Sequence, residues 1–187
     1  YDVADPEKDN GAGTGGKTIV GLLLCAMLFG GVYYSLIITK LPQHFDAGSS
    51  GVPSLETISK AGYLLFLVYL IGGFGQVFAG QWMEKREGRG LYIALLIGTV
   101  PLVYLVGVLG GMQLLVAAGA MAFFMFAVQP VENTLLARYT APGMRGRIYG
   151  LKFILTFGVG MGSGTHLSGW IEQGGLTDVL NSATLFR

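Results

Sequence analysis

The chain has 187 residues, of which 52% are hydrophobic and 12% carry a charge, about half the charged share of a soluble globular domain. With 31 glycines and a mean hydropathy of +0.58, this composition excludes a disordered chain and argues against a soluble enzyme. The formal net charge is only +1, so nothing indicates the broad basic surface that nucleic acid requires. We therefore expect a membrane protein.

Residues 1–17 are expected to form a cytoplasmic linker. They begin with an acidic, turn-forming stretch that lacks the basic-then-apolar order of a signal peptide, and we expect the chain to be part of a longer protein. Gly11–Thr18 fits the phosphate-binding pattern G-x-x-x-x-G-K-[ST]. That site needs a buried strand before the loop and a soluble helix after it. Since neither is expected here, nucleotide binding is not predicted.

Uncharged stretches predict an all-α, polytopic membrane helical bundle. Crossing about 30 Å of hydrocarbon takes about 20 helical residues. The long stretch Gly90–Val131 is expected to hold two spans, because Gly107, Gly110 and Gly111 favour a turn in its middle. Residues 172–187 would form an outer loop and the start of a sixth span. The five predicted spans cover about 18–40, 58–83, 90–109, 112–136 and 148–171.

Lys and Arg near the span ends predict the orientation, because they are retained on the cytoplasmic side. The predicted outer side carries only Lys40 and Lys60, and the long loop between them should face outward. We therefore expect a cytoplasmic amino terminus in a bacterial inner (plasma) membrane. The predicted cytoplasmic side carries Lys8, Lys17, Lys85, Arg86, Arg89, Arg138, Arg145 and Arg147.

The last predicted span carries the densest small-residue pattern of the chain. Gly158, Gly160, Gly162 and Gly164 form two overlapping pairs of glycines four residues apart. Such pairs let helix backbones approach closely in membranes. We expect this helix to pack tightly against a neighbour.

The loop Gly80–Gly90 joins two spans through a glycine, an acid, bases and a second glycine. It resembles the loop signature of the major facilitator superfamily of secondary transporters, approximately G-x-L-a-D-R-x-G-R-R. The matching residues are Gly80, Glu84, Lys85, Gly88 and Arg89. Three features depart from the signature: Glu84 replaces Asp, Arg86-Glu87 adds one residue, and Gly90 replaces the final base. Asn133–Gly150, followed by a glycine-rich helix through Gly164, is a second similarity.

The resemblance implies the carboxyl-terminal half of such a transporter, with residues 18–187 as a half-bundle and a twelfth helix starting near Leu180. It implies two bundles that rock about a central site, a missing amino-terminal half or partner membrane chain, and a loop that latches one conformation. The expected cargo is a small solute, moved by symport or antiport in a process coupled to protons.

Glu132 is the first candidate for a proton or substrate site, because an acid next to a long apolar run is costly and usually paired or functional. Three interpretations stay open: an ion pair with Lys152, a role in proton coupling or gating, and a solvated acid at the interface. Lys152 has a similar position on the next span.

Other polar residues in the spans are weaker candidates. Gln129 shares a helix face with Glu132 or Asn133, next to the kink-forming Pro130, and Gln76 should face protein or a cavity. Each glutamine is as well explained by helix–helix contact. Tyr33 and Tyr34 are interface anchors or cavity residues, and His166 is a carbonyl-bonded histidine or a proton relay.

No cofactor or metal is expected, because one cysteine, Cys25, and two histidines, His44 and His166, lack ligand spacing. The leading hypothesis is part of a secondary active transporter that works by alternating access. The alternative is a transporter-like structural or assembly subunit that carries pigment or lipid or serves as a scaffold in a larger membrane complex. An enzyme is not expected, since paired catalytic groups are lacking.

Overall fold

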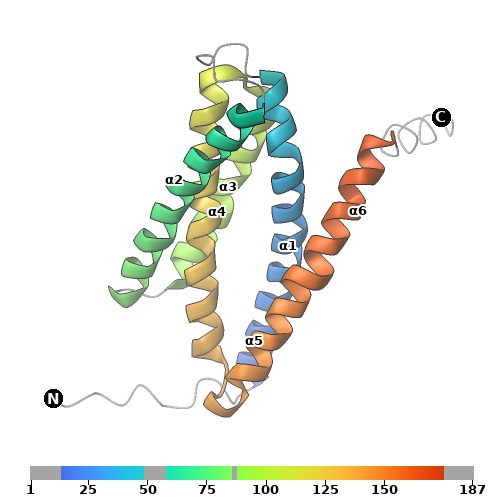
Figure 1. Ribbon diagram of the computed structural model, residues 1–187. Coiled ribbons are helices and arrows are strands. Elements are labelled where there is room, and N and C mark those ends of the chain that lie inside the picture. The colour runs from blue at the N-terminus through green and yellow to red at the C-terminus, as the bar shows by residue number, and fades with distance from the viewer. Residues whose placement is uncertain (1–13, 49–57, 86–87, 175–187) are drawn as a thin grey trace, which may run out of the picture. The chain divides into compact units, whose positions relative to one another are not determined.

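The computed structural model describes residues 14–48, 58–85 and 88–174, and within them the chain is helical, without a strand (Figure 1). Four helices are long and apolar enough to cross a membrane: α1 (Thr14–Gly48), α2 (Ile58–Lys85), α3 (Gly88–Val108) and α4 (Gly111–Tyr139). A 3-10 turn, η2 (Pro142–Met144), leads to α5 (Arg145–Phe153), the π-helix η3 (Ile154–Gly160) and α6 (Met161–Glu172). These helices are compatible with an integral membrane protein.

The prediction of five spans and the start of a sixth is wrong in its count. The described residues form five helices when residues 145–172 are counted as one path. This last path is divided by the π-helix into α-helical parts of nine and twelve residues, each shorter than the roughly 20 residues that a span takes. Residues 175–187, where the sixth span was expected, lie outside the described residues, as do residues 1–13 of the expected linker.

The turn between α3 and α4 falls at Leu109 and Gly110. Gly111, the first residue of α4, has a φ of 58°, a left-handed conformation that glycine adopts without the clash of a Cβ atom. The two helices therefore form a tight hairpin.

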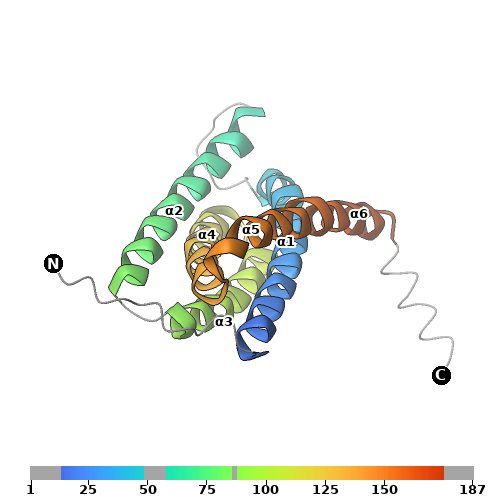
Figure 2. The same cartoon turned by 90° about the horizontal axis from the view of Figure 1, so that it is seen from below.

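The described residues divide into two compact units. The first, which includes residues 42–142, contains α2, α3 and α4, and α4 lies between the other two (Figure 2). Half of the membrane-length window of α4 is buried, against 17% in α3, because α4 contacts helices on two sides. Its small residues Ala118 and Ala127 are fully buried, which allows this close packing.

Aromatic rings of α4 fill the spaces left by glycines of α2 and α3. A Cβ atom on Gly72 would collide with the ring of Phe126, and one on Gly98 would lie 2.5 Å from Cε1 of Phe124. The Phe126 ring also stacks on Tyr69, with centroids 5.8 Å apart. Glycine on one helix and phenylalanine on the next therefore form matched pairs.

The second unit contains residues 18–41 of α1 and the helical path from Arg145 to Glu172. Residue numbers increase in the same direction along the contact on both helices, because Gly31 meets Gly160 and Ser35 meets Gly164. The two helices therefore run parallel, and small residues form their contact.

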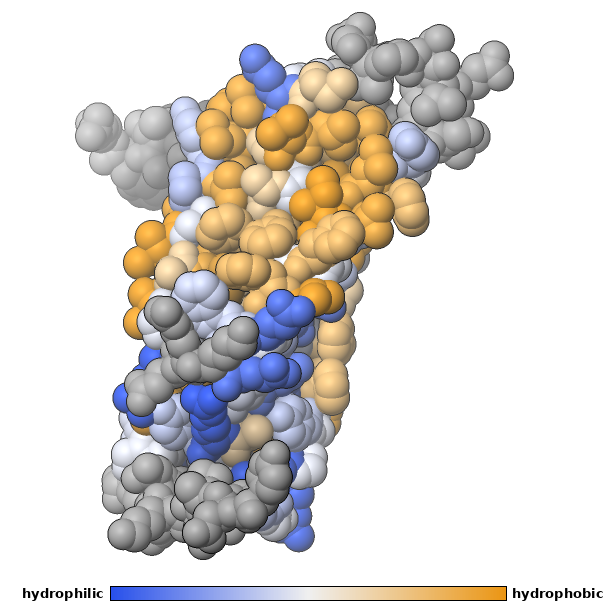
Figure 3. All heavy atoms as spheres, turned by 90° about the vertical axis from the view of Figure 1, so that its left-hand side faces the viewer, coloured by the Kyte–Doolittle hydropathy of each residue, from blue (hydrophilic) through white to orange (hydrophobic). Residues whose placement is uncertain are grey.

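The outward side of the first unit is apolar over most of its length. The side of α2 in Figure 3 is largely orange and becomes blue toward the end at which α2 gives way to α3. Large apolar side chains are exposed there, among them Phe66, Phe74 and Val77. Exposed apolar side chains of this number fit a surface that faces lipid rather than water.

Candidate functional site

Glu132 lies in the α3–α4 contact, toward the end of the hairpin opposite the turn at Leu109 and Gly110. Its residue is only 6% exposed, and the hydroxyl of Tyr92 on α3 donates a hydrogen bond to its Oε1 at 3.2 Å. Burying a carboxylate is costly unless hydrogen bonds or an opposite charge compensate it. The Tyr92 hydroxyl supplies part of that compensation and joins the two helices at the acid.

The backbone next to Glu132 has lost one helical hydrogen bond. Pro130 lies inside α4 and has no N–H group to donate to the carbonyl one turn earlier. One turn later, the hydroxyl of Thr134 donates to the Pro130 carbonyl at 2.9 Å. Of the neighbouring candidates, Gln129 is half-buried and Asn133 is exposed, so only Glu132 among the three is buried.

A second group of contacts, which we call the clasp, joins the α2–α3 turn to the carboxyl end of α4. Arg89 Nε donates a hydrogen bond to the Tyr139 hydroxyl, and the Arg89 guanidinium lies 5.1 Å from the centre of the Tyr139 ring. Arg138 Nη2 donates to the Met83 carbonyl at 3.4 Å. Gly88 packs against the Met83 side chain, where a Cβ atom would collide. The clasp therefore fixes three helices at one end of the unit.

The predicted latch residues occupy different environments in this region. Gly80 is half-buried, Glu84 is exposed at the end of α2, and Lys85 is the last residue of that helix. Gly88 is buried and Arg89 exposed at the start of α3. Arg86 and Glu87 lie outside the described residues. Among the latch residues, Gly88 and Arg89 make the contacts that carry the clasp.

Sequence reasoning missed Tyr92, Tyr139 and Met83 as partners in these contacts. Tyr92 lies 40 residues before Glu132, and Arg89 lies 50 residues before Tyr139. No local spacing could reveal such pairs. The sequence did contain one signal, because Tyr92 and Tyr139 lie near the ends of spans that also carry arginines. A tyrosine offers both a hydrogen-bond donor and a ring that can bind a cation.

The remaining candidates do not gather at Glu132. Gln76 is exposed on α2. Tyr33 is half-buried on α1, and its buried hydroxyl has no partner among the described residues, whereas Tyr34, also half-buried, has one. Lys152 on α5 is only 2% exposed and has an interaction of its own. Since Glu132 and Lys152 belong to different units, their ion pair stays a prediction.

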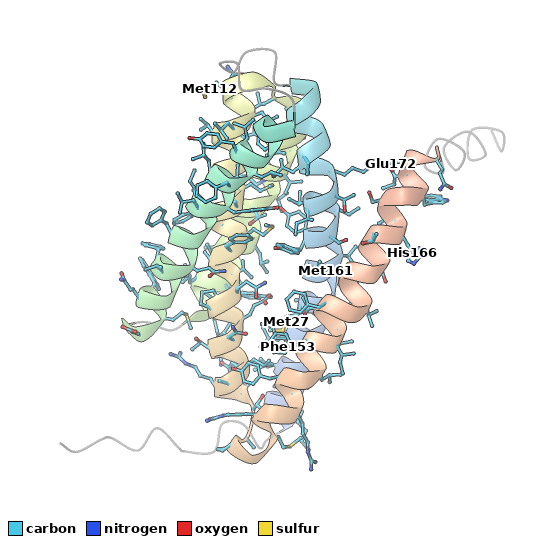
Figure 4. The ribbon with its side chains drawn as sticks, in the orientation of Figure 1. Met27, Met112, Phe153, Met161, His166 and Glu172 are labelled. Carbon is cyan, nitrogen blue, oxygen red and sulfur yellow. The ribbon has the colours of Figure 1, made fainter. Side chains whose placement is uncertain are left out.

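The four glycines of the last helical path lie on two sides. Gly160 and Gly164 are buried against α1, whereas no described atom lies within 4 Å of a Cβ placed on Gly158 or Gly162. His166 is exposed and points away from α1, and Glu172 lies at the far end of α6 (Figure 4). Glu172 forms an ion pair with Lys40 of α1 there.

The described residues contain no group of three or more His, Cys, Asp or Glu side chains that could hold a metal ion. Cys25 is exposed on α1. In the phosphate-loop pattern, Gly11–Gly13 lie outside the described residues, and α1 begins at Thr14, so Gly15–Lys17 are helical.

No family model, curated protein or solved structure matches the chain. What the structure shows is four apolar helices of membrane-spanning length and two groups of contacts, around Glu132 and Arg89.

Proposed function

We propose that the chain is part of a secondary transporter of the major facilitator type. It moves a small solute across the membrane by alternating access, and Glu132 takes up and releases the coupled proton. The observation that carries this proposal is a carboxyl group that is 6% exposed in an apolar, membrane-length helix and accepts a hydrogen bond from the next helix. Ionisable groups at such positions mark ion and proton pathways in membrane proteins.

The Tyr92–Glu132 hydrogen bond gives protonation a mechanical consequence. As a carboxylate, Glu132 is only an acceptor, and a hydrogen bond to a charged acceptor is stronger than one between neutral groups. Once Glu132 binds a proton, the charge is gone and one of its oxygens becomes a donor. Proton binding therefore weakens the contact between α3 and α4, and proton release restores it.

The clasp supports a mechanism with distinct conformations. It holds the ends of α2, α3 and α4 through Arg89–Tyr139 and Arg138–Met83, about seven residues, or roughly 10 Å of helix rise, from Glu132. A change of the α3–α4 contact at Glu132 is therefore carried along α4 to the clasp, which opens or closes one end of the unit. This is the role that the family resemblance gives to the loop around Gly88.

The test is solute-dependent proton movement. The purified protein is reconstituted in vesicles that contain a pH-sensitive dye, and sugars, amino acids, nucleosides and organic ions are added in turn. We expect at least one of these solutes to move protons. Glu132→Gln should abolish that proton movement, while solute exchange across equal concentrations persists.

Glu172→Gln is the matched control, because Glu172 is an exposed acid at the end of a helix in the other unit. Its proton movement should equal that of the unchanged protein. Absence of proton movement with every solute contradicts coupled transport. Unchanged coupling in Glu132→Gln contradicts the role of Glu132.

A further inference from the structure

The π-helix in the last helical path decides which side of α6 meets α1. A π turn closes its hydrogen bonds from i to i+5 and so holds about one residue more than an α turn. The Met161 N–H group bonds the Thr156 carbonyl in this way. Relative to a continuous α-helix, α6 is therefore shifted by about one residue, which corresponds to a rotation of about 100°.

The shifted register places the small residues of α6 against α1. A Cβ atom on Gly160 would lie 2.7 Å from the Leu28 carbonyl oxygen and 3.0 Å from Cα of Gly31, and one on Gly164 would lie 2.7 Å from Cβ of Ser35. The hydroxyls of Ser35 and Thr165 are 3.0 Å apart and share a hydrogen bond. This contact, which we call the seam, admits no larger side chain at these glycines.

A continuous α-helix from the same α5 would present different residues to α1. Each position of α6 would then be taken by the preceding residue, so Ser163 would replace Gly164 and Leu167 would replace Ser168. Leu167 is now 38% exposed, whereas Ser168 is 1% exposed. The seam has no room for leucine, so the α form and the close helix contact exclude each other.

The seam also contains a cost that opposes the π form. The hydroxyls of Thr156 and Ser168 are buried and have no hydrogen-bond partner among the described residues. A buried hydroxyl without a partner destabilises the state that buries it. The close contact of the backbones favours the π form, and these two hydroxyls oppose it.

We propose that η3 is a rotational switch. Conversion of η3 between π and α geometry rotates α6 about its axis and thereby closes or opens the contact of α6 with α1. This inference goes beyond transport and is tested without any solute. Packed helices have discrete arrangements rather than a continuous range, because only some side chains fit each interface. The two forms differ in which residues face Ser35. They are Gly164 and Thr165 in the π form, and Ser163 and Gly164 in the rotated form.

Cysteine pairs distinguish the two forms in the purified protein in lipid nanodiscs. The exposed Cys25 is first replaced by alanine. Ser35→Cys with Thr165→Cys reports the π form, and Ser35→Cys with Ser163→Cys reports the rotated form. Ser35→Cys with Gly162→Cys is the control, because residue 162 faces α1 in neither form. The disulfide formation rate of each pair is measured under the same oxidant.

We expect the Thr165 pair to form fastest. If the rotated form has a minor population of about 0.1–10%, the Ser163 pair forms about 10- to 1000-fold more slowly, yet clearly faster than the Gly162 pair. A Ser163 pair no faster than the Gly162 pair overturns the proposal.

Deletion of Val159, an exposed residue of η3, tests whether the π-helix causes the rotation. Removing one residue converts the segment to α while Gly164 and Thr165 keep their positions against α1. The Thr165 pair should form as before, which also shows that the variant is folded, and the Ser163 pair should fall to the Gly162 rate. An unchanged Ser163 rate overturns the role of η3. If the deletion variant does not fold, the three pairs in the undeleted chain decide.

Discussion

Glycines bring helices together in both units. Besides the contact of Gly75 with the Phe123 carbonyl, the first unit has glycines whose neighbouring space is filled by side chains. In the first unit, the rings of Phe126 and Phe124 occupy the space beside Gly72 and Gly98. In the second unit, the backbone carbonyl of Thr156 and Cα of Gly160 face Gly31 directly. A ring can rotate when its space changes, whereas a backbone moves only with its whole helix. The second contact is therefore far less tolerant of added atoms.

The two units also treat buried polar groups differently. In the first unit, the buried carboxylate of Glu132 accepts the Tyr92 hydroxyl. In the second, the buried hydroxyls of Thr156 and Ser168 have no hydrogen-bond partner among the described residues. The hydrogen bond in the first unit stabilises the observed contact of α3 and α4. The two hydroxyls in the second unit destabilise the observed contact of α1 and α6 relative to an arrangement that exposes them. This contrast fits an acid site whose helix contact depends on the charge of Glu132 in one unit and a movable helix in the other.

Gly31→Ala should have the largest effect on stability. Its Cβ atom would collide with the Thr156 carbonyl and lie 3.2 Å from Cα of Gly160, so α1 and α6 must separate. We expect a loss of about 3 kcal/mol, the upper part of the range for overpacking, in chemical unfolding in mixed micelles. Gly30→Ala is the matched control, because no described atom lies within 4 Å of its Cβ. Equal losses in the two variants would contradict the seam.

The polar contrast predicts effects of opposite sign. Tyr92→Phe leaves the buried Glu132 without this donor and should destabilise the protein by about 1–2 kcal/mol. Ser168→Ala removes a buried hydroxyl that has no described partner, so stability should be unchanged or rise by up to about 1 kcal/mol. Both are measured by the same unfolding transition. Destabilisation by Ser168→Ala as large as that by Tyr92→Phe would show that Ser168 has a partner.

Gly72→Ala tests how tolerant the contact filled by a ring is. The new methyl group meets the Phe126 ring, which can move aside, so we expect a loss of about 1 kcal/mol. Phe126→Leu in the same chain should recover most of that loss, because the smaller side chain makes room. Gly73→Ala, where no described atom lies within 4 Å, should have no such dependence on Phe126. Additive effects of Gly72→Ala and Phe126→Leu would contradict the pairing.

The sequence predicts the four long helices well, because the length of an apolar run and the charges at its ends are local properties. The division of the last helix could not be predicted. α and π turns differ in one hydrogen-bond step, and the same glycines suit both. The spacing of Gly158, Gly160, Gly162 and Gly164 likewise defines two helix sides, and only the register set by η3 decides which side is buried.

The candidate site was predictable in part for a similar reason. Glu132 is conspicuous as an acid beside a long apolar run. Its partner Tyr92 depends on how α3 is rotated against α4, which no spacing within either helix records. The same holds for Tyr139, since its contact with Arg89 needs the ends of two helices to meet. Local patterns therefore identify single residues, and tertiary packing selects their partners.

The smallest effect is expected for the ion pair Lys40–Glu172, which joins α1 and α6 beyond the seam. Its side chains are 35% and 47% exposed, and exposed pairs contribute less than about 1 kcal/mol. Lys40→Gln and Glu172→Gln should therefore change stability little, but a double-mutant cycle isolates their coupling. This coupling requires the helices to be close, so it should vanish in Gly31→Ala and persist in Gly30→Ala. Coupling retained in Gly31→Ala would mean that the helix ends stay together when the backbone contact is lost.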